Sequence, residues 1–121
     1  MQLAADLATA AVALLHVYIL VLEMFLWTRA VKVFGIPRED RDNVTMQTML
    51  KNQGLYNGFL AAGLVWGLLH PDPAIGFQVQ LFFLGCVAVA GLYGAATANV
   101  RILFVQTVPA AIAIALRVLA G

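Results

Sequence analysis

Charged residues are scarce in this 121-residue chain. Lys, Arg, Asp and Glu together make up 11 % of it, whereas hydrophobic residues make up 63 %. A typical soluble domain has about 25 % charged and about 45–50 % apolar residues. A soluble protein this small could not bury so much apolar surface, because a small domain keeps a large share of its residues exposed. The composition therefore excludes an ordinary soluble domain, a disordered chain and a nucleic-acid-binding protein.

Cysteine is nearly absent, since Cys86 is the only one. A single cysteine excludes an internal disulfide and a cysteine-based metal site. The chain also has no phosphate-binding loop, no zinc signature and no nucleophile elbow. We therefore predict no metal site, and the sequence does not identify a cofactor.

Long apolar runs fill most of the chain. A membrane-spanning helix needs about 20 mostly apolar residues, with a range of about 17–25. Four stretches meet this requirement: residues 7–27, 53–69, 77–98 and 102–119. We predict an all-α polytopic membrane protein, with one domain over residues 1–121 folded as a four-transmembrane-helix bundle.

The few cations lie on one side of the predicted bundle. Residues 28–52 hold five Lys or Arg and the 99–101 turn holds Arg101, whereas the opposite side holds only Arg117. Cytoplasmic loops carry an excess of Lys and Arg. We therefore expect loops 28–52 and 99–101 in the cytoplasm and both termini outside. In a bacterium, this would be an integral protein of the inner (plasma) membrane.

Glycine and proline predict where the helices start, bend and end. Gly35-Ile36-Pro37 is typical of a turn, and Asn43 is placed to cap a helix that continues into the second span. Loop 70–76 contains two prolines and is expected to be a tight outer turn. Pro109 cannot donate to the carbonyl of Val105, so we expect a kink in the fourth span.

Small residues indicate where the spans approach closely, because membrane helices associate through close packing. The second and third stretches carry seven such glycines: Gly54, Gly58, Gly63, Gly67, Gly85, Gly91 and Gly94. The favoured interpretation is tight packing within one chain. The alternative is a homodimer that meets through the Gly54 and Gly58 face.

Polar residues inside the predicted spans are concentrated near the cytoplasmic ends. A charged group near the centre of a bilayer costs at least about 2.5–3.5 kcal/mol, so each needs a reason to be there. Spacing by seven puts His16 and Glu23 on one face of the first helix. The predicted ligand-binding residues are Glu23, Trp27, Gln53, Tyr56, Asn57, Tyr93 and Gln106. His16 is included as well, although it is expected in the outer half of its span.

Glu23 admits a structural and a functional interpretation. It is either a carboxyl held by Asn, Gln and Tyr donors as part of the packing, or the centre of a cytosol-facing pocket that binds a ligand or exchanges a proton. A core histidine is the favoured interpretation of His16. Haem ligation by His16 and His70 is disfavoured, because the two are expected at different depths.

Two blocks of sequence resemble a known family. Residues 22–27 read LEMFLW and residues 52–64 read NQGLYNGFLAAGL. Both resemble small membrane proteins of the family known as domain of unknown function 1304, and the similarity extends from His16 to Pro109. The resemblance implies four transmembrane helices and no particular function. That family is distantly similar to DoxX-like four-helix membrane proteins, one of which is a subunit of a thiosulfate:quinone oxidoreductase. This is an analogy of fold and favours a small amphipathic ligand.

Three functions fit these observations. The first is a protein that binds a lipid, a quinone or a similar molecule, or that serves as a membrane accessory subunit. The second is a proton-coupled small-molecule transporter that works as a dimer. The third is a membrane isomerase or an oxidoreductase subunit, and we regard an enzyme as less favoured than a binding protein.

Overall fold

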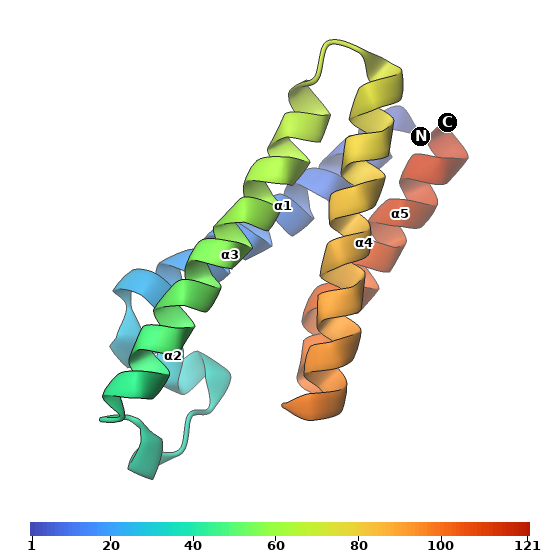
Figure 1. The fold of residues 1–121 in the computed structure, drawn as a ribbon. Coiled ribbons are helices and arrows are strands. Elements are labelled where there is room, and N and C mark those ends of the chain that lie inside the picture. Colours follow the sequence, from blue (N-terminus) through green and yellow to red (C-terminus); the bar gives the residue numbers. More distant parts are fainter. The chain divides into compact units, whose positions relative to one another are not determined.

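The computed structural model describes all residues from 1 to 121 as helices and turns (Figure 1). The α-helices are α1 (Gln2–Phe25), α2 (Trp27–Phe34), α3 (Val44–Leu69), α4 (Pro73–Thr97) and α5 (Val108–Ala120). A 3-10 turn covers Arg38–Asp40, and a π-helical segment covers Leu103–Thr107. The predicted all-α class is confirmed. The structure has five α-helices where four were predicted, because the expected first loop contains α2.

Three helical segments are long and apolar enough to cross a membrane. They are Gln2–Phe25, Pro73–Thr97 and Leu103–Ala120. These coincide with three of the four predicted spans. Helix α3 is long enough, at 26 residues, but Asn52, Gln53 and Asn57 make its first half polar.

The first predicted span ends two residues early. Leu26 leaves the helical conformation, with φ −123° and ψ 60°, and α2 begins at Trp27. Helix α2 buries Ala30 and Val31 and ends at Gly35, whose φ of 64° is left-handed and suits glycine. The predicted turn at Gly35-Ile36-Pro37 is therefore confirmed, but residues 27–34 form a helix that buries Ala30 and Val31.

Side-chain caps begin the two central helices. The Asn43 Oδ1 atom accepts a hydrogen bond from the Met46 N–H at 3.0 Å, which confirms the predicted cap of α3. Helix α4 begins at Pro73, and the Asp72 carboxylate accepts from the N–H groups of Ala74 and Ile75. Residues 70–72 thus form the tight turn that the prolines predict.

Pro109 is accommodated by a π-helical turn before it. The Val108 N–H donates to the Leu103 carbonyl, five residues earlier. This wider turn is a common way to absorb a disruption in a helix. The sequence predicts a kink here, and the structure has a wider turn immediately before Pro109. The Thr107 hydroxyl of this turn donates to the Ala88 carbonyl of α4 at 3.0 Å.

The chain divides into two compact units. The first comprises Met1–Leu14 with Leu60–Gly121, and the second comprises Leu15–Phe59. In the first unit α4 and α5 run side by side, and the two termini lie close together (Figure 1). The core of this unit combines residues of four helices: Val12, Ala13, Leu64, Leu84, Val87, Ala110 and Ala113.

An ion pair joins the two ends of the first unit. The Arg117 guanidinium donates to Asp6 Oδ1 at 2.5 Å and to Gln2 Oε1 at 3.0 Å. Arg117 is 5 % exposed, so its charge needs this partner. The pair joins the start of α1 to the end of α5. Arg117, the lone cation on the predicted outer side, is therefore neutralised.

Glycines in the first unit allow close helix contacts. A Cβ atom at Gly91 would lie 2.8 Å from the Thr107 backbone nitrogen and 3.0 Å from the Gln106 Cβ. Gly63 and Gly67 likewise face the Phe83 and Gln80 side chains of α4. Gly85 differs, because nothing lies within 4 Å of the position of its Cβ. The expectation that Gly85 marks a packed face is therefore wrong.

These contacts predict opposite effects for two glycine substitutions in α4. Gly91→Ala should lower the free energy of unfolding by about 1–3 kcal/mol, because the methyl group would press on backbone atoms. Gly85→Ala should leave stability unchanged or raise it by about 0.5–1 kcal/mol, because alanine favours the helix. Thermal unfolding of both purified variants checks this, and equal losses would contradict the described packing.

Candidate functional site

The candidate site is a buried carboxyl group on α1 that two amides of α3 hold. Glu23 is 2 % exposed. Its Oε1 atom accepts a hydrogen bond from Asn57 Nδ2 at 2.9 Å, and its Oε2 atom accepts one from Gln53 Nε2 at 2.8 Å. Gln53 and Asn57 are four residues apart, so they lie one turn apart on the same face of the helix. That spacing lets both amides reach one carboxylate.

Two glycines bring the helices close enough for these bonds. A Cβ atom at Gly54 would lie 2.8 Å from Met24 Cγ and 3.0 Å from Glu23 Cβ. A Cβ at Gly58 would lie 2.5 Å from Leu20 Cδ1. The Gly54-x-x-x-Gly58 stripe therefore packs on α1 of the same chain, and the short Asn57 side chain can reach the carboxylate.

The carboxyl group has hydrogen-bond donors but no cation beside it. The ion pair of Arg117 is with Asp6, and no Lys or Arg pairs with Glu23. Amide donors satisfy the oxygen atoms of a buried carboxylate, but they carry no charge that balances it. Such a group can bind a cation or a hydrogen-bond donor of a ligand, or it can exchange a proton. The chain has no group of three His, Cys, Asp or Glu side chains that could hold a metal ion.

Access to the carboxylate differs between its two oxygen atoms. Asn57, which holds Oε1, is buried at 7 % exposure, whereas Gln53, which holds Oε2, is exposed. The bond from Gln53 is therefore part-buried, whereas the bond from Asn57 is buried. Because each amide also has an acceptor oxygen, both side chains can accept a hydrogen bond from a ligand as well.

Two predicted ligand residues of this unit have other contacts. The Trp27 indole N–H donates to the Arg41 carbonyl at 3.0 Å, and the Gln47 amide donates to the same oxygen at 2.8 Å. Trp27 thereby holds the loop after α2. Tyr56 is 59 % exposed, and its ring lies 6.1 Å from that of Phe59. Neither Trp27 nor Tyr56 hydrogen-bonds to Glu23.

The remaining three predicted residues lie elsewhere along the helices. His16 is fully buried on α1 and has an interaction partner. Tyr93 and Gln106 belong to the first unit, where Tyr93 is 72 % exposed and Gln106 is half-buried with a partner of its own. Within the second unit, the structure thus joins Glu23, Gln53 and Asn57 in one hydrogen-bonded cluster.

Sequence reasoning missed two shallow grooves beside α2. One is lined by Trp27, Thr28, Val31, Lys32, Arg41, Asp42 and Gln47, and the other by Phe25, Leu26, Trp27, Thr28, Arg29 and Lys32. Leu26, where the helical conformation breaks, lines the second groove, and no residue type in the sequence indicates this break. The cations that line these grooves, Arg29, Lys32 and Arg41, are the residues of the sequence that indicate such a surface.

The cluster predicts a graded loss of stability. Glu23→Ala should lower the free energy of unfolding by about 1–3 kcal/mol, because the Asn57 amide would be buried without an acceptor. Gln53→Ala should cost less, because water can replace an exposed amide. Unfolding of the purified variants in detergent checks this order, and a larger loss for Gln53→Ala would contradict it.

Comparison with known proteins places this chain in a family. The family described as Protein of unknown function (DUF1304) matches residues 10–118. An uncharacterized protein, YpaA of Lactococcus lactis subsp. lactis (strain IL1403), is 34 % identical over 97 residues, which cover 78 % of this chain and 80 % of YpaA. No solved structure matches this chain. The match over residues 10–118 shows that this chain belongs to the DUF1304 family.

Proposed function

We propose that the protein is a single-domain integral membrane protein in which α3 is the fourth span of a four-helix bundle. The polar residues that lower the apolar character of α3 include Gln53 and Asn57, and both donate hydrogen bonds to Glu23. A span can carry polar side chains when they face a neighbouring helix. The polar residues of α3 are therefore compatible with a membrane-spanning helix.

The proposed orientation has both termini outside and loops 28–52 and 99–101 in the cytoplasm. Support comes from the charges, because Arg117 on the outer side is paired with Asp6. The other six Lys and Arg, all on the inner side, are in no ion pair. In a bacterium, the membrane would be the inner membrane.

We propose that the Glu23 cluster binds a small amphipathic molecule, such as a lipid or quinone, that carries a hydrogen-bond donor. The observation that carries this proposal is a buried carboxylate held only by amides, one of which is exposed. His16, Trp27, Tyr56, Tyr93 and Gln106 stay predicted contacts of such a ligand. The protein could carry out the same binding function as an accessory subunit of a membrane complex, where it would present the ligand to a partner protein.

A proton-coupled transporter is the second candidate, because an intramembrane carboxyl group without a cation is what proton coupling requires. Four helices would need a dimer for this task. Gly54 and Gly58 already contact Leu20, Glu23 and Met24 of their own chain. A dimer through these glycines would therefore require α1 to move. An isomerase or oxidoreductase subunit has less support, because both groups bonded to Glu23 are amides and not acids or bases.

The binding proposal predicts a bound molecule that depends on Glu23. The protein would be extracted gently from its host membrane and analysed by native mass spectrometry. Wild type should retain a defined small molecule, and Glu23→Gln and Asn57→Ala should reduce its occupancy about tenfold or more, as expected when a hydrogen bond to a charged group is lost.

Gln80→Ala is the matched control, because Gln80 is also a buried amide and donates to the Gly67 carbonyl at 3.1 Å in the other unit. This variant should keep the ligand. Empty wild-type protein, or equal loss from Gln80→Ala, would contradict a binding site at Glu23 and favour a purely structural role.

The orientation is tested separately with reporter tags. A tag inserted after Arg38 should report the cytoplasm, and a tag after Gly121 should report the outside. The opposite result at either position would overturn the proposed topology. Signals from both sides at one position would favour a transporter whose two copies insert in opposite orientations and pair as a dimer.

A further inference from the structure

We propose that the groove between the end of α1 and the start of α2 binds the headgroup of an anionic phospholipid in the inner leaflet. This α1–α2 groove is lined by Phe25, Leu26, Trp27, Thr28, Arg29 and Lys32, and its volume is ≈ 510 Å³. It is separate from the Glu23 cluster, since Glu23 does not line it. The proposal rests on the inner-side placement of α2, but not on a ligand at Glu23.

The first argument is the chemistry of the lining. Arg29 and Lys32 are three residues apart and exposed, so both side chains lie on one face of α2. An arginine and a lysine together offer up to eight N–H donors, which suit the oxygen atoms of a phosphodiester. The groove contains no acidic residue. This pattern selects an anion.

The second argument is that these cations are not already neutralised. Residues 28–52 contain Glu39, Asp40 and Asp42, yet none of them pairs with Arg29 or Lys32 within the 4.0 Å limit of an ion pair. Elsewhere in the chain, the buried Arg117 has its acidic partner Asp6. The positive charge of the groove is therefore open to an external partner.

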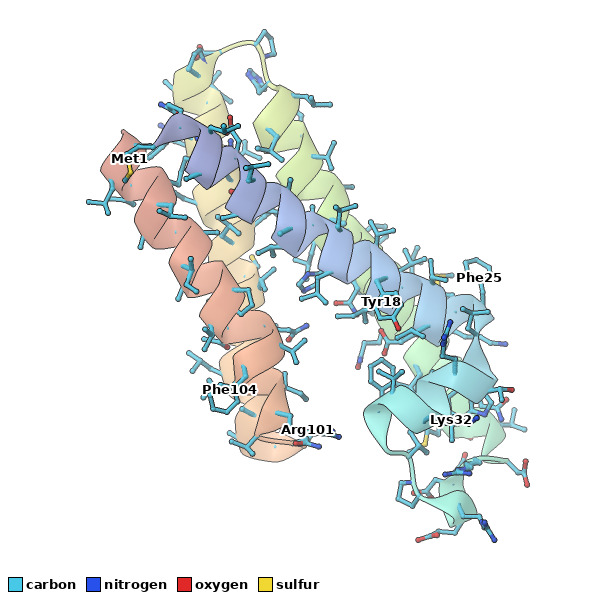
Figure 2. The ribbon with its side chains drawn as sticks, turned by 180° about the vertical axis from the view of Figure 1, so that it is seen from behind. Met1, Tyr18, Phe25, Lys32, Arg101 and Phe104 are labelled. Atoms are coloured by element: carbon cyan, nitrogen blue, oxygen red, sulfur yellow. The ribbon has the colours of Figure 1, made fainter.

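The third argument distinguishes a lipid from a free anion. The other end of the groove is apolar, with Phe25 71 % exposed and Leu26 41 % exposed. Figure 2 shows the Phe25 and Lys32 side chains on this part of the molecule, one from the end of α1 and one from α2. Apolar and cationic linings side by side match the acyl chain and the headgroup of one lipid molecule.

The fourth argument comes from the backbone. The break at Leu26 separates the apolar α1 from the short amphipathic α2. Trp27 lies at this junction, and tryptophan prefers the boundary between hydrocarbon and headgroups. The groove is thereby expected at the depth of the lipid phosphates.

The test uses purified protein in detergent micelles that contain equal amounts of phosphatidylglycerol and phosphatidylcholine. Native mass spectrometry would count each lipid retained. Wild type should retain phosphatidylglycerol preferentially. Arg29→Gln with Lys32→Gln should weaken this retention about twenty-five-fold, because each cation near an anionic lipid contributes about fivefold.

The matched control is Arg38→Gln with Lys51→Gln, which removes the same charge at exposed positions outside the groove. It should weaken retention no more than about threefold, as expected for a screened effect at a distance. Equal losses in the two double variants would overturn the proposal, because they would show a diffuse surface charge. No preference for phosphatidylglycerol in wild type would overturn it as well.

Two further arms separate a lipid from a free anion and from misfolding. Phe25→Gln should also reduce lipid retention, and excess inorganic phosphate should not displace the lipid. Displacement by phosphate would mean a free-anion site and would overturn the lipid assignment. Unchanged thermal unfolding of each variant is expected, because the substituted side chains are exposed.

Discussion

A carboxyl group inside an apolar helix must find hydrogen-bond donors in the same chain, and this constraint organises the second unit. The apolar side chains of α1 offer no donor, and Glu23 accepts hydrogen bonds from Asn57 and Gln53 of α3. Both amides reach it only because Gly54 and Gly58 let α3 approach α1 closely. The polar residues and the glycines of α3 thus contribute to the same contact between α1 and α3.

The cations obey the same rule as Glu23, because a buried charged group needs a partner within the chain and an exposed one does not. Arg117 is buried in the first unit and has an acidic partner in Asp6, whereas Arg29 and Lys32 lie exposed on α2 without one. A cation at the edge of a membrane can remain unpaired in the chain because water and lipid phosphates surround it. The proposed orientation and the α1–α2 groove therefore have a common physical origin.

Much of the fold could be predicted from residue types whose effect is local. Asn43 caps α3 and Gly35 begins the turn at residues 35–37, as the sequence predicts, although α2 itself was expected to be loop. A wider helical turn precedes Pro109, where the sequence predicts a kink. The glycine and amide spacing on α3 also brings Gln53 and Asn57 to Glu23. The break at Leu26 could not be predicted, because leucine is a good helix former and only the amphipathic packing of α2 explains the change. The open surroundings of Gly85 could not be predicted either, because the spacing of glycines does not show which of them lie against a neighbouring helix.

The central claim is that Glu23 and Asn57 are energetically coupled, and a double-mutant cycle tests it most directly. The free energies of unfolding of wild type, Glu23→Ala, Asn57→Ala and the double variant would be measured in one detergent. The account predicts a coupling energy of about 1–2 kcal/mol, so that the double variant is less damaged than the sum of the single variants. Additive losses would contradict it, because they would mean that the two side chains do not depend on each other.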